Sequence, residues 1–251
     1  MGVPLEVMRT CDGVNEIDVR GRFASGAARR VGVLCMVLSS ALPVLAQGAV
    51  SGRVTLTERP GEQSTDIGNT VIYLVPTASA SARATPANAS IAMNARTFVP
   101  RVRVVTPGSR VDFPNQDPFS HNIFSTTPGA VFDLGLYPSG RSRDTQFRRA
   151  GVFPVYCNIH PRMTAFVVVV PSPYFTMAGG DGRWTLPHVP AGEYTLHIWH
   201  ERSAAETRQP LLVAATGQAG VDVTVDARGF RFAQHKNKFG REYDRTGRDR
   251  Y

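Results

Sequence analysis

Hydrophobic and polar residues alternate along most of the chain in short stretches, and no stretch has the three-to-four-residue period of an amphipathic helix. A period of two places successive side chains on opposite faces, as in a half-buried β-strand. Turn dipeptides such as Pro107-Gly108 and Pro128-Gly129 separate these stretches. Many short strands with frequent turns predict an all-β chain built from β-sandwiches. The pattern predicts strands near residues 54–56, 71–75, 102–104, 111–113, 121–125, 152–156 and 165–170.

Composition excludes several classes of protein. Of the 251 residues, 42% are hydrophobic and 19% are charged, which is typical of a folded chain and not of a disordered one. The longest apolar run, 31–46, is interrupted by two serines and a proline and is shorter than the roughly 18–20 residues of a membrane span. Three cysteines are too few for a disulfide scaffold. We therefore expect neither an integral membrane protein, nor a coiled coil, nor a cysteine-rich miniprotein.

Residues 1–46 have the organisation of an export signal with a long N-terminal region. Two arginines precede an apolar core, which ends in the small-residue pattern of a signal-peptidase site. We predict cleavage after Ala46 and export to a periplasm of the Gram-negative type. Cleavage would remove Cys11 and Cys35. Cys157 would then be the one thiol of the mature chain and could not form an internal disulfide.

The net charge of +8 is concentrated at the C-terminus. Residues 227–251 hold eight basic and three acidic side chains, whereas residues 47–226 hold 15 and 13. A basic tail of this kind can contact acidic partners or a membrane surface, but it is more often a solvated terminus. We expect a solvated terminus, with an acidic or membrane-surface contact as the alternative. We expect no nucleic-acid partner.

Four side chains could bind one metal ion, and three of them are close together in the sequence. Cys157, His160 and Met163 lie within seven residues at the end of a predicted strand, and His121 lies 36 residues before the cysteine. Two imidazoles, a thiolate and a weak thioether are the donors of a blue-copper electron-transfer site. The thiolate and the thioether favour Cu(I), while the imidazoles suit both oxidation states. The pattern predicts one type 1 copper per chain.

Zinc binding and nucleophilic catalysis are the alternatives for these residues. Zinc takes cysteine and histidine, but methionine is a poor zinc ligand, and no second cysteine or spaced histidine pair completes a structural site. A Cys-His pair can also act as nucleophile and base, although a methionine three residues after the histidine has no part in that chemistry. The sequence has no phosphate loop, serine elbow or zinc-protease helix motif. We therefore expect a protein that is not an enzyme.

At these residues the chain resembles the cupredoxins. Its Cys-x2-His-x2-Met spacing, with proline after the histidine, is that of the amicyanin ligand loop, and the chain is also similar to plastocyanin-like bacterial proteins of the methylamine-utilisation type. The resemblance covers about residues 91–171 and implies a Greek-key cupredoxin β-sandwich. Besides the ligand loop, it is carried by Phe98-Val-Pro100, Val111-Asp-Phe-Pro-Asn-Gln-Asp117, Phe132-Asp-Leu-Gly-Leu-Tyr137 and Gly151-Val-Phe-Pro-Val-Tyr-Cys157.

The resemblance also implies roles for individual residues. His121, Cys157 and His160 would be the equatorial ligands of the copper, and Met163 would be the axial one. Asn122, beside the first ligand, would tie the ligand loop to its neighbouring strand. His160 would be the port through which electrons enter and leave. The partners would be redox proteins, such as a c-type cytochrome, a dehydrogenase or an oxidase.

Segments on both sides of the copper region resemble a second family. Residues 52–56 and 67–76 look like the opening strands of a carboxypeptidase-regulatory-like β-sandwich, and residues 181–200 look like its closing strands. This implies a small Ig-like second sandwich into which the cupredoxin is inserted; two independent units in series are the alternative. The expected order is 1–46 signal, 47–90 opening strands and linker, 91–171 cupredoxin, 172–227 closing strands and 228–251 basic tail.

Together these features favour an exported type 1 copper protein that carries single electrons between redox partners. A periplasmic copper-binding or delivery protein would use the same ligands without passing electrons. A non-redox β-sandwich binding module would use the second sandwich instead. The other four histidines show no pattern of a second metal site, and we expect structural or surface roles for them: His188, His197, His200 and His235.

Overall fold

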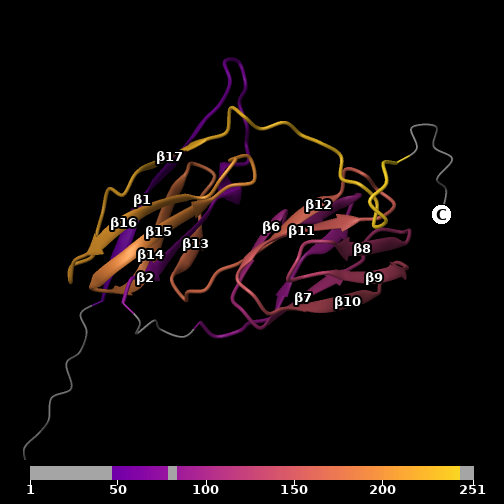
Figure 1. Ribbon diagram of the computed structural model, residues 1–251, viewed down its shortest axis with the longest axis horizontal. Coiled ribbons are helices and arrows are strands. Elements are labelled where there is room, and N and C mark those ends of the chain that lie inside the picture. The colour runs from indigo at the N-terminus through magenta and orange to yellow at the C-terminus, as the bar shows by residue number, and fades with distance from the viewer. Residues whose placement is uncertain (1–46, 79–83, 244–251) are drawn as a thin grey trace, which may run out of the picture. The chain divides into compact units, whose positions relative to one another are not determined.

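The strands expected from the alternating pattern are present in the structure, a computed structural model that describes residues 47–78 and 84–243 (Figure 1). The described residues form strands and one short 3-10 turn, and they contain no α-helix, so the all-β prediction is confirmed. The elements are β1 (Gln47–Thr57), η1 (Ile67–Asn69), β2 (Val71–Pro76), β3 (Ala89–Ser90), β4 (Ala92–Asn94), β5 (Thr97–Val99), β6 (Val102–Val105), β7 (Ser109–Pro114), β8 (His121–Ser125), β9 (Phe132–Tyr137), β10 (Ser142–Phe147), β11 (Gly151–Cys157), β12 (Thr164–Val169), β13 (Phe175–Met177), β14 (Arg183–Pro190), β15 (Gly192–Trp199), β16 (Thr207–Val213) and β17 (Val223–Asp226).

Strands β3–β12 form one β-sandwich, which we call the central sandwich. Its two sheets have the orders β10-β7-β3 and β6-β12-β11-β8-β9, and β4 and β5 form a hairpin. On β11 every second side chain is buried, namely Phe153, Val155 and Cys157. This is the alternation expected of a strand with one face on the core. The cysteine of the predicted metal site therefore lies inside the apolar core.

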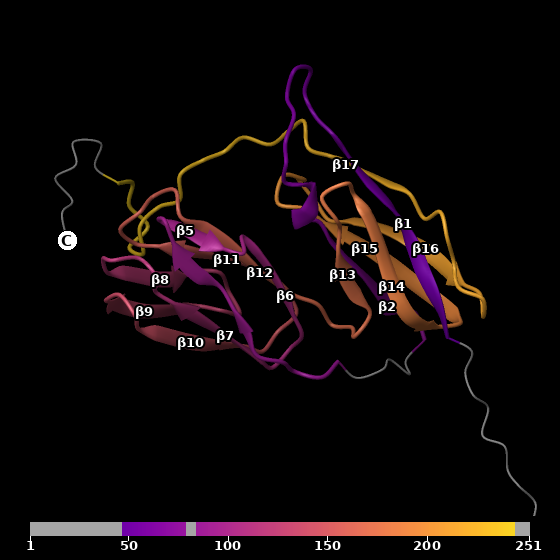
Figure 2. The ribbon, with the colours of Figure 1, turned by 180° about the vertical axis from the view of Figure 1, so that it is seen from behind.

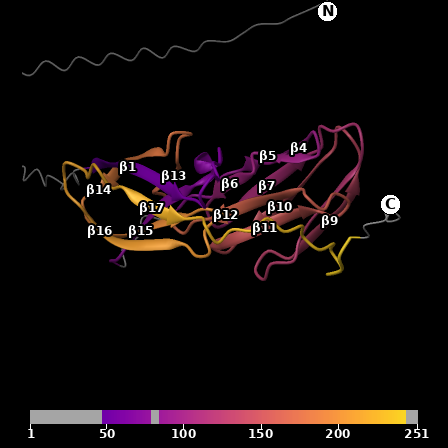
Figure 3. The same cartoon turned by 90° about the horizontal axis from the view of Figure 1, so that it is seen from above.

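The other strands form a second β-sandwich, the terminal sandwich, from both ends of the described chain. In one sheet β1 lies between β14 and β17, and in the other the order is β13-β2-β15-β16; both sheets can be followed in Figures 2 and 3. Strands that precede the central sandwich thus pair with strands that follow it. The chain leaves the terminal sandwich after β2 and returns to it at β13. The boundaries of the domains and the resemblance to the carboxypeptidase-regulatory-like family stay predictions.

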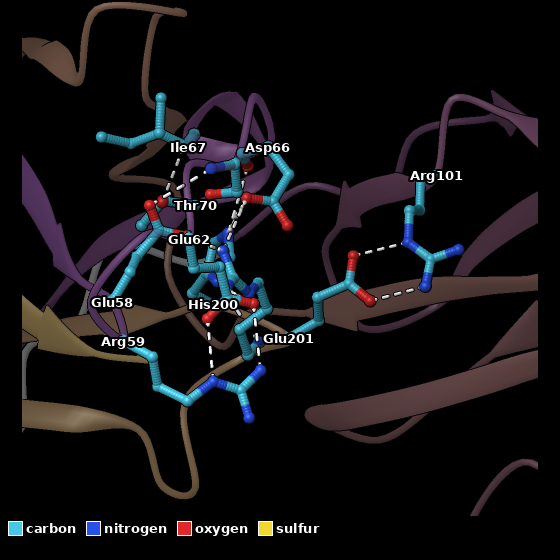
Figure 4. Close-up of polar contacts among 11 residues, drawn as sticks. Glu58, Arg59, Glu62, Asp66, Ile67, Thr70, Arg101, His200 and Glu201 are labelled. Carbon is cyan, nitrogen blue, oxygen red and sulfur yellow. Dashed lines mark hydrogen bonds and ion pairs between the residues drawn. The ribbon is translucent and has the colours of Figure 1, made fainter. Parts of the chain in front are cut away.

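Apolar and charged contacts join strands of the two sandwiches. The ring of Phe166 on β12 lies 5.4 Å from that of Trp199 on β15. Arg101 donates two hydrogen bonds to the Glu201 carboxylate, at 2.5 and 2.6 Å (Figure 4). The Glu201 side chain is only 4% exposed, so its charge is compensated mainly by this guanidinium.

The C-terminal tail is exposed over most of residues 229–243, as its charge suggests, but two of its side chains are buried. These side chains are those of His235 and Asn237, and the tail can be followed in yellow in Figure 1. The expectation of a solvated terminus fails at these two residues because aromatic and hydrogen-bonding side chains without a regular spacing supply their contacts.

The predicted signal, residues 1–46, lies outside the described residues, as do residues 79–83 and 244–251. Within the described part of the chain, no helix is long and apolar enough to cross a membrane.

Replacing Arg101 by methionine leaves the buried Glu201 carboxylate without its partner. Breaking a buried ion pair from one side costs about 3–5 kcal/mol. Because the Arg101 side chain is 34% exposed, we expect solvent to reduce the loss to about 2 kcal/mol. Denaturant unfolding of the metal-free protein measures it. The matched variant Arg101→Met/Glu201→Leu removes both charges and should be more stable than Arg101→Met; a double variant that loses as much or more would contradict the prediction.

Candidate metal centre

His121 and Cys157 come from neighbouring strands that pair antiparallel. β8 begins at His121 and β11 ends at Cys157, which lies opposite Ile123. Residues opposite one another face the same side of a sheet, and so do residues two apart on one strand. The imidazole and the thiol therefore point into the same core, and both are fully buried.

A short loop returns His160 and Met163 towards the cysteine. The N–H of His160 donates to the Cys157 carbonyl (3.4 Å), and the N–H of Met163 donates to the His160 carbonyl (2.9 Å). The Cys157 N–H then donates to the Met163 carbonyl (3.2 Å) and closes the loop just before β12 begins at Thr164. Two consecutive turns thus account for the spacing of two residues between one donor and the next.

Three donor atoms converge in the core. The Cys157 sulfur lies 3.4 Å from Nδ1 of His121 and 3.4 Å from Nδ1 of His160, and the three ligand atoms all lie within 4.8 Å of one another. Imidazole nitrogen and thiolate sulfur bind an ion such as zinc at about 2.0 and 2.3 Å, so two such donors on one ion lie roughly 3–4 Å apart. The two sulfur–nitrogen separations, and the chemistry of the donors, therefore fit one first-row metal ion.

Met163 is buried in the same core cluster as Cys157, with 2% of its surface exposed. It ends the loop that carries Cys157 and His160, and its carbonyl accepts a hydrogen bond from the Cys157 N–H. Its role as the axial ligand stays a prediction.

Burial sets the protonation states of the three converging donors. It lowers the pKa of His160 to about 4, with the neighbouring His121 and Arg96 acting in the same direction. It also lowers the pKa of His121, although the Asp117 carboxylate opposes this. Both imidazoles are therefore neutral at pH 7, which is the form that binds metals. Burial raises the pKa of the Cys157 thiol, so a metal must displace its proton.

Asp117 orients the first histidine. Its carboxylate lies 2.8 Å from Nε2 of His121, so the Nε2–H donates to it and Nδ1 is left to face the sulfur. The backbone N–H groups of Ala95 and Arg96 also donate to this carboxylate, at 2.7 and 3.0 Å. Burial raises the pKa of Asp117, but the Arg96 N–H, the His121 ring and the Ala95 N–H outweigh it and bring the pKa below its usual value. A carboxylate in this position fixes the ring and its tautomer.

Asp117 is a residue of the site that was not predicted from the sequence. Its position four residues before His121 could have indicated a contact with that histidine. Because Asp117 precedes Pro118, it looks like an ordinary turn residue, and a turn position does not indicate a metal site. Its other two partners come from the β4–β5 hairpin, where Ala95 and Arg96 have positive φ angles of 50° and 56° that aim their N–H groups at the carboxylate.

Asn122 contacts the ligand loop in a different way from the one expected. Its backbone carbonyl accepts a hydrogen bond from the Asn158 N–H (2.8 Å). Its side-chain amide instead donates to Asp133 on β9 (2.6 Å), and its Oδ1 has no hydrogen-bond partner among the residues that the structure describes. The main chain of Asn122 therefore makes the hydrogen bond between β8 and the ligand loop, while its side chain joins β8 to β9.

His160 is half-buried beside an aromatic ring. The Phe119 ring lies 5.7 Å from it and 5.2 Å from the ring of His121. The guanidinium of Arg96 covers Phe119 at 5.0 Å. The electron port assigned to His160 stays a prediction, and its half-exposed position is compatible with that role.

The remaining histidines lie outside this group of donors. In the described ranges, no other group of three or more His, Cys, Asp or Glu side chains brings its ligand atoms together. His188 is exposed on β14 with a φ of 56°. His197 binds Glu206 at 3.0 Å and His200 binds the Asp66 carbonyl at 3.1 Å.

No family model matches the chain, and no curated protein matches it. Solved structures similar to part of it include a purple cupredoxin from Nitrosopumilus maritimus, with 26% identity over 33% of this chain and 99% of that one (TM-score 0.30). Amicyanin from Paracoccus versutus is 18% identical over 39% of this chain and 98% of that one (TM-score 0.31).

A copper-containing nitrite reductase from Thermus scotoductus is 22% identical over 38% of this chain (TM-score 0.32), but the match spans only 25% of the reductase. These structural neighbours are cupredoxins or contain copper by name. Because every TM-score is below 0.5, the case for a metal site rests on the geometry of its own residues.

Replacing Asp117 by asparagine should weaken metal binding without removing a donor. Loss of a carboxylate that orients a ligand histidine costs about 10–100-fold in metal affinity. The measurement is competition for Cu(II) against a chelator, in a chain carrying Cys11→Ser and Cys35→Ser so that Cys157 is the one thiol; we call this the Cys157-only chain. Asp144→Asn, on the exposed surface of β10, is the matched control. Equal affinities in the two variants would contradict a role for Asp117.

Proposed function

We propose that this chain is an exported type 1 copper protein that carries single electrons between redox partners. The observation that carries the proposal is the convergence of two neutral imidazoles and one thiol at the edge of the apolar core, with a methionine on the same short loop. This is the donor set of a blue-copper site. A copper ion bound there would supply a one-electron Cu(II)/Cu(I) couple.

The donors favour copper over zinc. A structural zinc site has four strong donors from cysteine and histidine. Here three such donors converge, and the remaining candidate, Met163, is a thioether. A soft thiolate and thioether with two imidazoles suits copper in both oxidation states.

The surroundings of the donors suit an electron carrier because they limit movement. Asp117 holds the ring of His121. The Asn122 carbonyl and the Cys157–Met163 hydrogen bond hold the ligand loop at both of its ends. Donors that are already fixed in place need little rearrangement when the charge of the site changes. His160, half-buried at the edge of the site, is the proposed point of electron entry.

The cellular setting is part of the proposal. Export to a periplasm of the Gram-negative type follows from the sequence of residues 1–46, and the partners would be redox proteins such as a c-type cytochrome, a dehydrogenase or an oxidase. The chain converts no substrate of its own. The terminal sandwich, with its carboxypeptidase-regulatory-like sequence, would be a non-catalytic module beside the electron carrier.

Optical and EPR spectra of the Cys157-only chain with Cu(II) test the proposal. We expect an intense visible thiolate-to-copper band that bleaches with ascorbate and returns on reoxidation. Cys157→Ser should lose the band entirely. Met163→Leu should keep the band but change the reduction potential, because the axial ligand tunes it. Met177→Leu, on β13 of the terminal sandwich, is the control and should match the parent.

A protein that stays colourless with Cu(II) would overturn the electron-carrier proposal. Copper that leaves quickly to a mild chelator, with no reversible reduction, would support copper delivery instead. An unchanged cellular function of Cys157→Ser would support the β-sandwich binding module.

A further inference from the structure

The C-terminal tail reaches the predicted ligand loop. After β17 the chain turns at Phe230, whose ring lies 5.6 Å under the guanidinium of Arg202. Residues 229–243, which we call the C-terminal strap, then run to the ends of β8, β9 and β11, in yellow in Figures 1 and 2. Its contacts fall on the strand ends that carry the donors.

His235 is the buried centre of the strap, with 9% of its surface exposed. Its ring stacks on Tyr156 at 4.5 Å and meets the edge of Phe124 at 6.0 Å. Its Nε2 lies 3.2 Å from the carbonyl oxygen of His160, and its Nδ1 lies 2.9 Å from that of Lys236. A neutral imidazole carries one N–H, and the tautomer with the proton on Nε2 donates to His160. A strap residue therefore binds the main chain of a predicted ligand while its ring packs on the two strands that carry the other donors.

Two further hydrogen bonds reach the residues around the cysteine. The backbone N–H of Lys238 donates to the side-chain oxygen of Asn158 at 2.9 Å. The Tyr243 hydroxyl donates to the carbonyl of Cys157 at 3.2 Å. The strap thus contacts three of the first four residues of the loop.

The strap also joins the opposite side of the site. The ammonium group of Lys238 lies 2.6 Å from Asp133, and the same carboxylate accepts the side-chain N–H of Asn122. The Asn122 carbonyl accepts the N–H of Asn158, which returns the connection to the ligand loop. The contacts form a closed path from strap to β9, β8, loop and back to strap.

The strap is itself braced for this role. Asn237 is buried, and its side-chain oxygen accepts the N–H groups of Phe239 and Arg241, both at 3.0 Å. The backbone of Asn237 also exchanges hydrogen bonds with Arg241 and Gly240. A turn with a fixed conformation can constrain another segment at a low cost, because it loses little conformational entropy when it makes the contact.

We propose that the C-terminal strap positions the metal-ligand loop. His235 and Tyr243 fix the carbonyls of His160 and Cys157, and Lys238 fixes Asn158, so that the loop keeps its donor geometry with or without a metal. The part of this inference that concerns copper rests on the proposed function. A strap of this kind slows the escape of the metal and sets the geometry that the thiolate band reports.

Variants that remove hydrogen-bond donors of the strap side chains test the inference. In the Cys157-only full chain, His235→Phe keeps an aromatic ring against Tyr156 but loses the N–H, and Tyr243→Phe loses one hydroxyl. We expect the double variant to lose Cu(II) to EDTA about tenfold faster than the parent. The thiolate band and the EPR hyperfine splitting should change as well. The controls are Ala233→Ser and Gln234→Ala, which alter exposed side chains of the same strap and should match the parent.

Amide hydrogen exchange of the metal-free chain provides a readout that needs no copper. The N–H groups of Asn158, His160 and Met163 are hydrogen-bonded within the site. We expect them to exchange about tenfold faster in the double variant and unchanged in the controls. If the chain binds no copper, the proposed function fails, and this measurement alone decides the role of the strap.

Several outcomes would overturn the inference. The inference is wrong if the double variant matches the controls in its rate of copper loss, its spectra and the hydrogen exchange of the loop amides. A lower unfolding midpoint with unchanged copper release and loop exchange would overturn it too, because the strap would then stabilise the fold without positioning the loop. If the double variant does not fold, Tyr243→Phe alone removes a single oxygen and should still speed exchange of the Asn158 and His160 amides; an unchanged rate there would also overturn it.

Discussion

The pairing of β8 with β11 is the contact on which the rest of the site depends. It sets Cys157 opposite Ile123 and so turns the thiol and the His121 ring to the same side of the sheet. A slip of one residue in this register would turn the thiol to the opposite face of the strand. The register is held by the apolar core, because Phe153, Val155 and Cys157 are buried together on β11. The packing that stabilises the central sandwich therefore also assembles the donors.

The same dependence explains which parts of the site could be predicted from sequence. Cys157, His160 and Met163 are local: two turns connect them, and the spacing alone carries the information. His121 is distant in sequence, but it begins a strand whose apolar residues Ile123 and Phe124 indicate a buried position. The all-β architecture was predictable for a related reason, since alternation reports directly on which face of a strand meets the core.

The parts that could not be predicted depend on contacts without a periodic signal. Asp117 stands before a proline in what looks like an ordinary turn, and its partners at residues 95 and 96 come from another hairpin. The three hydrogen bonds from the strap to the loop span 75, 80 and 86 residues. No local pattern encodes such pairs. The tail was therefore interpreted from its charge, which was the one property that its sequence displayed.

Part of that charge is paired with acidic side chains within the described residues. Lys238 binds Asp133, Arg228 binds Asp226 at 2.8 Å, and Lys236 lies 3.7 Å from Glu242. The basic residues of the strap thus help to fix its course, while its rings and hydrogen bonds make the contacts with the loop. The strap follows β17 of the terminal sandwich, and its braced part, residues 237–241, lies next to the residues that contact the ligand loop. A segment outside the central sandwich in sequence thus supplies hydrogen bonds to the main chain of Cys157 and His160.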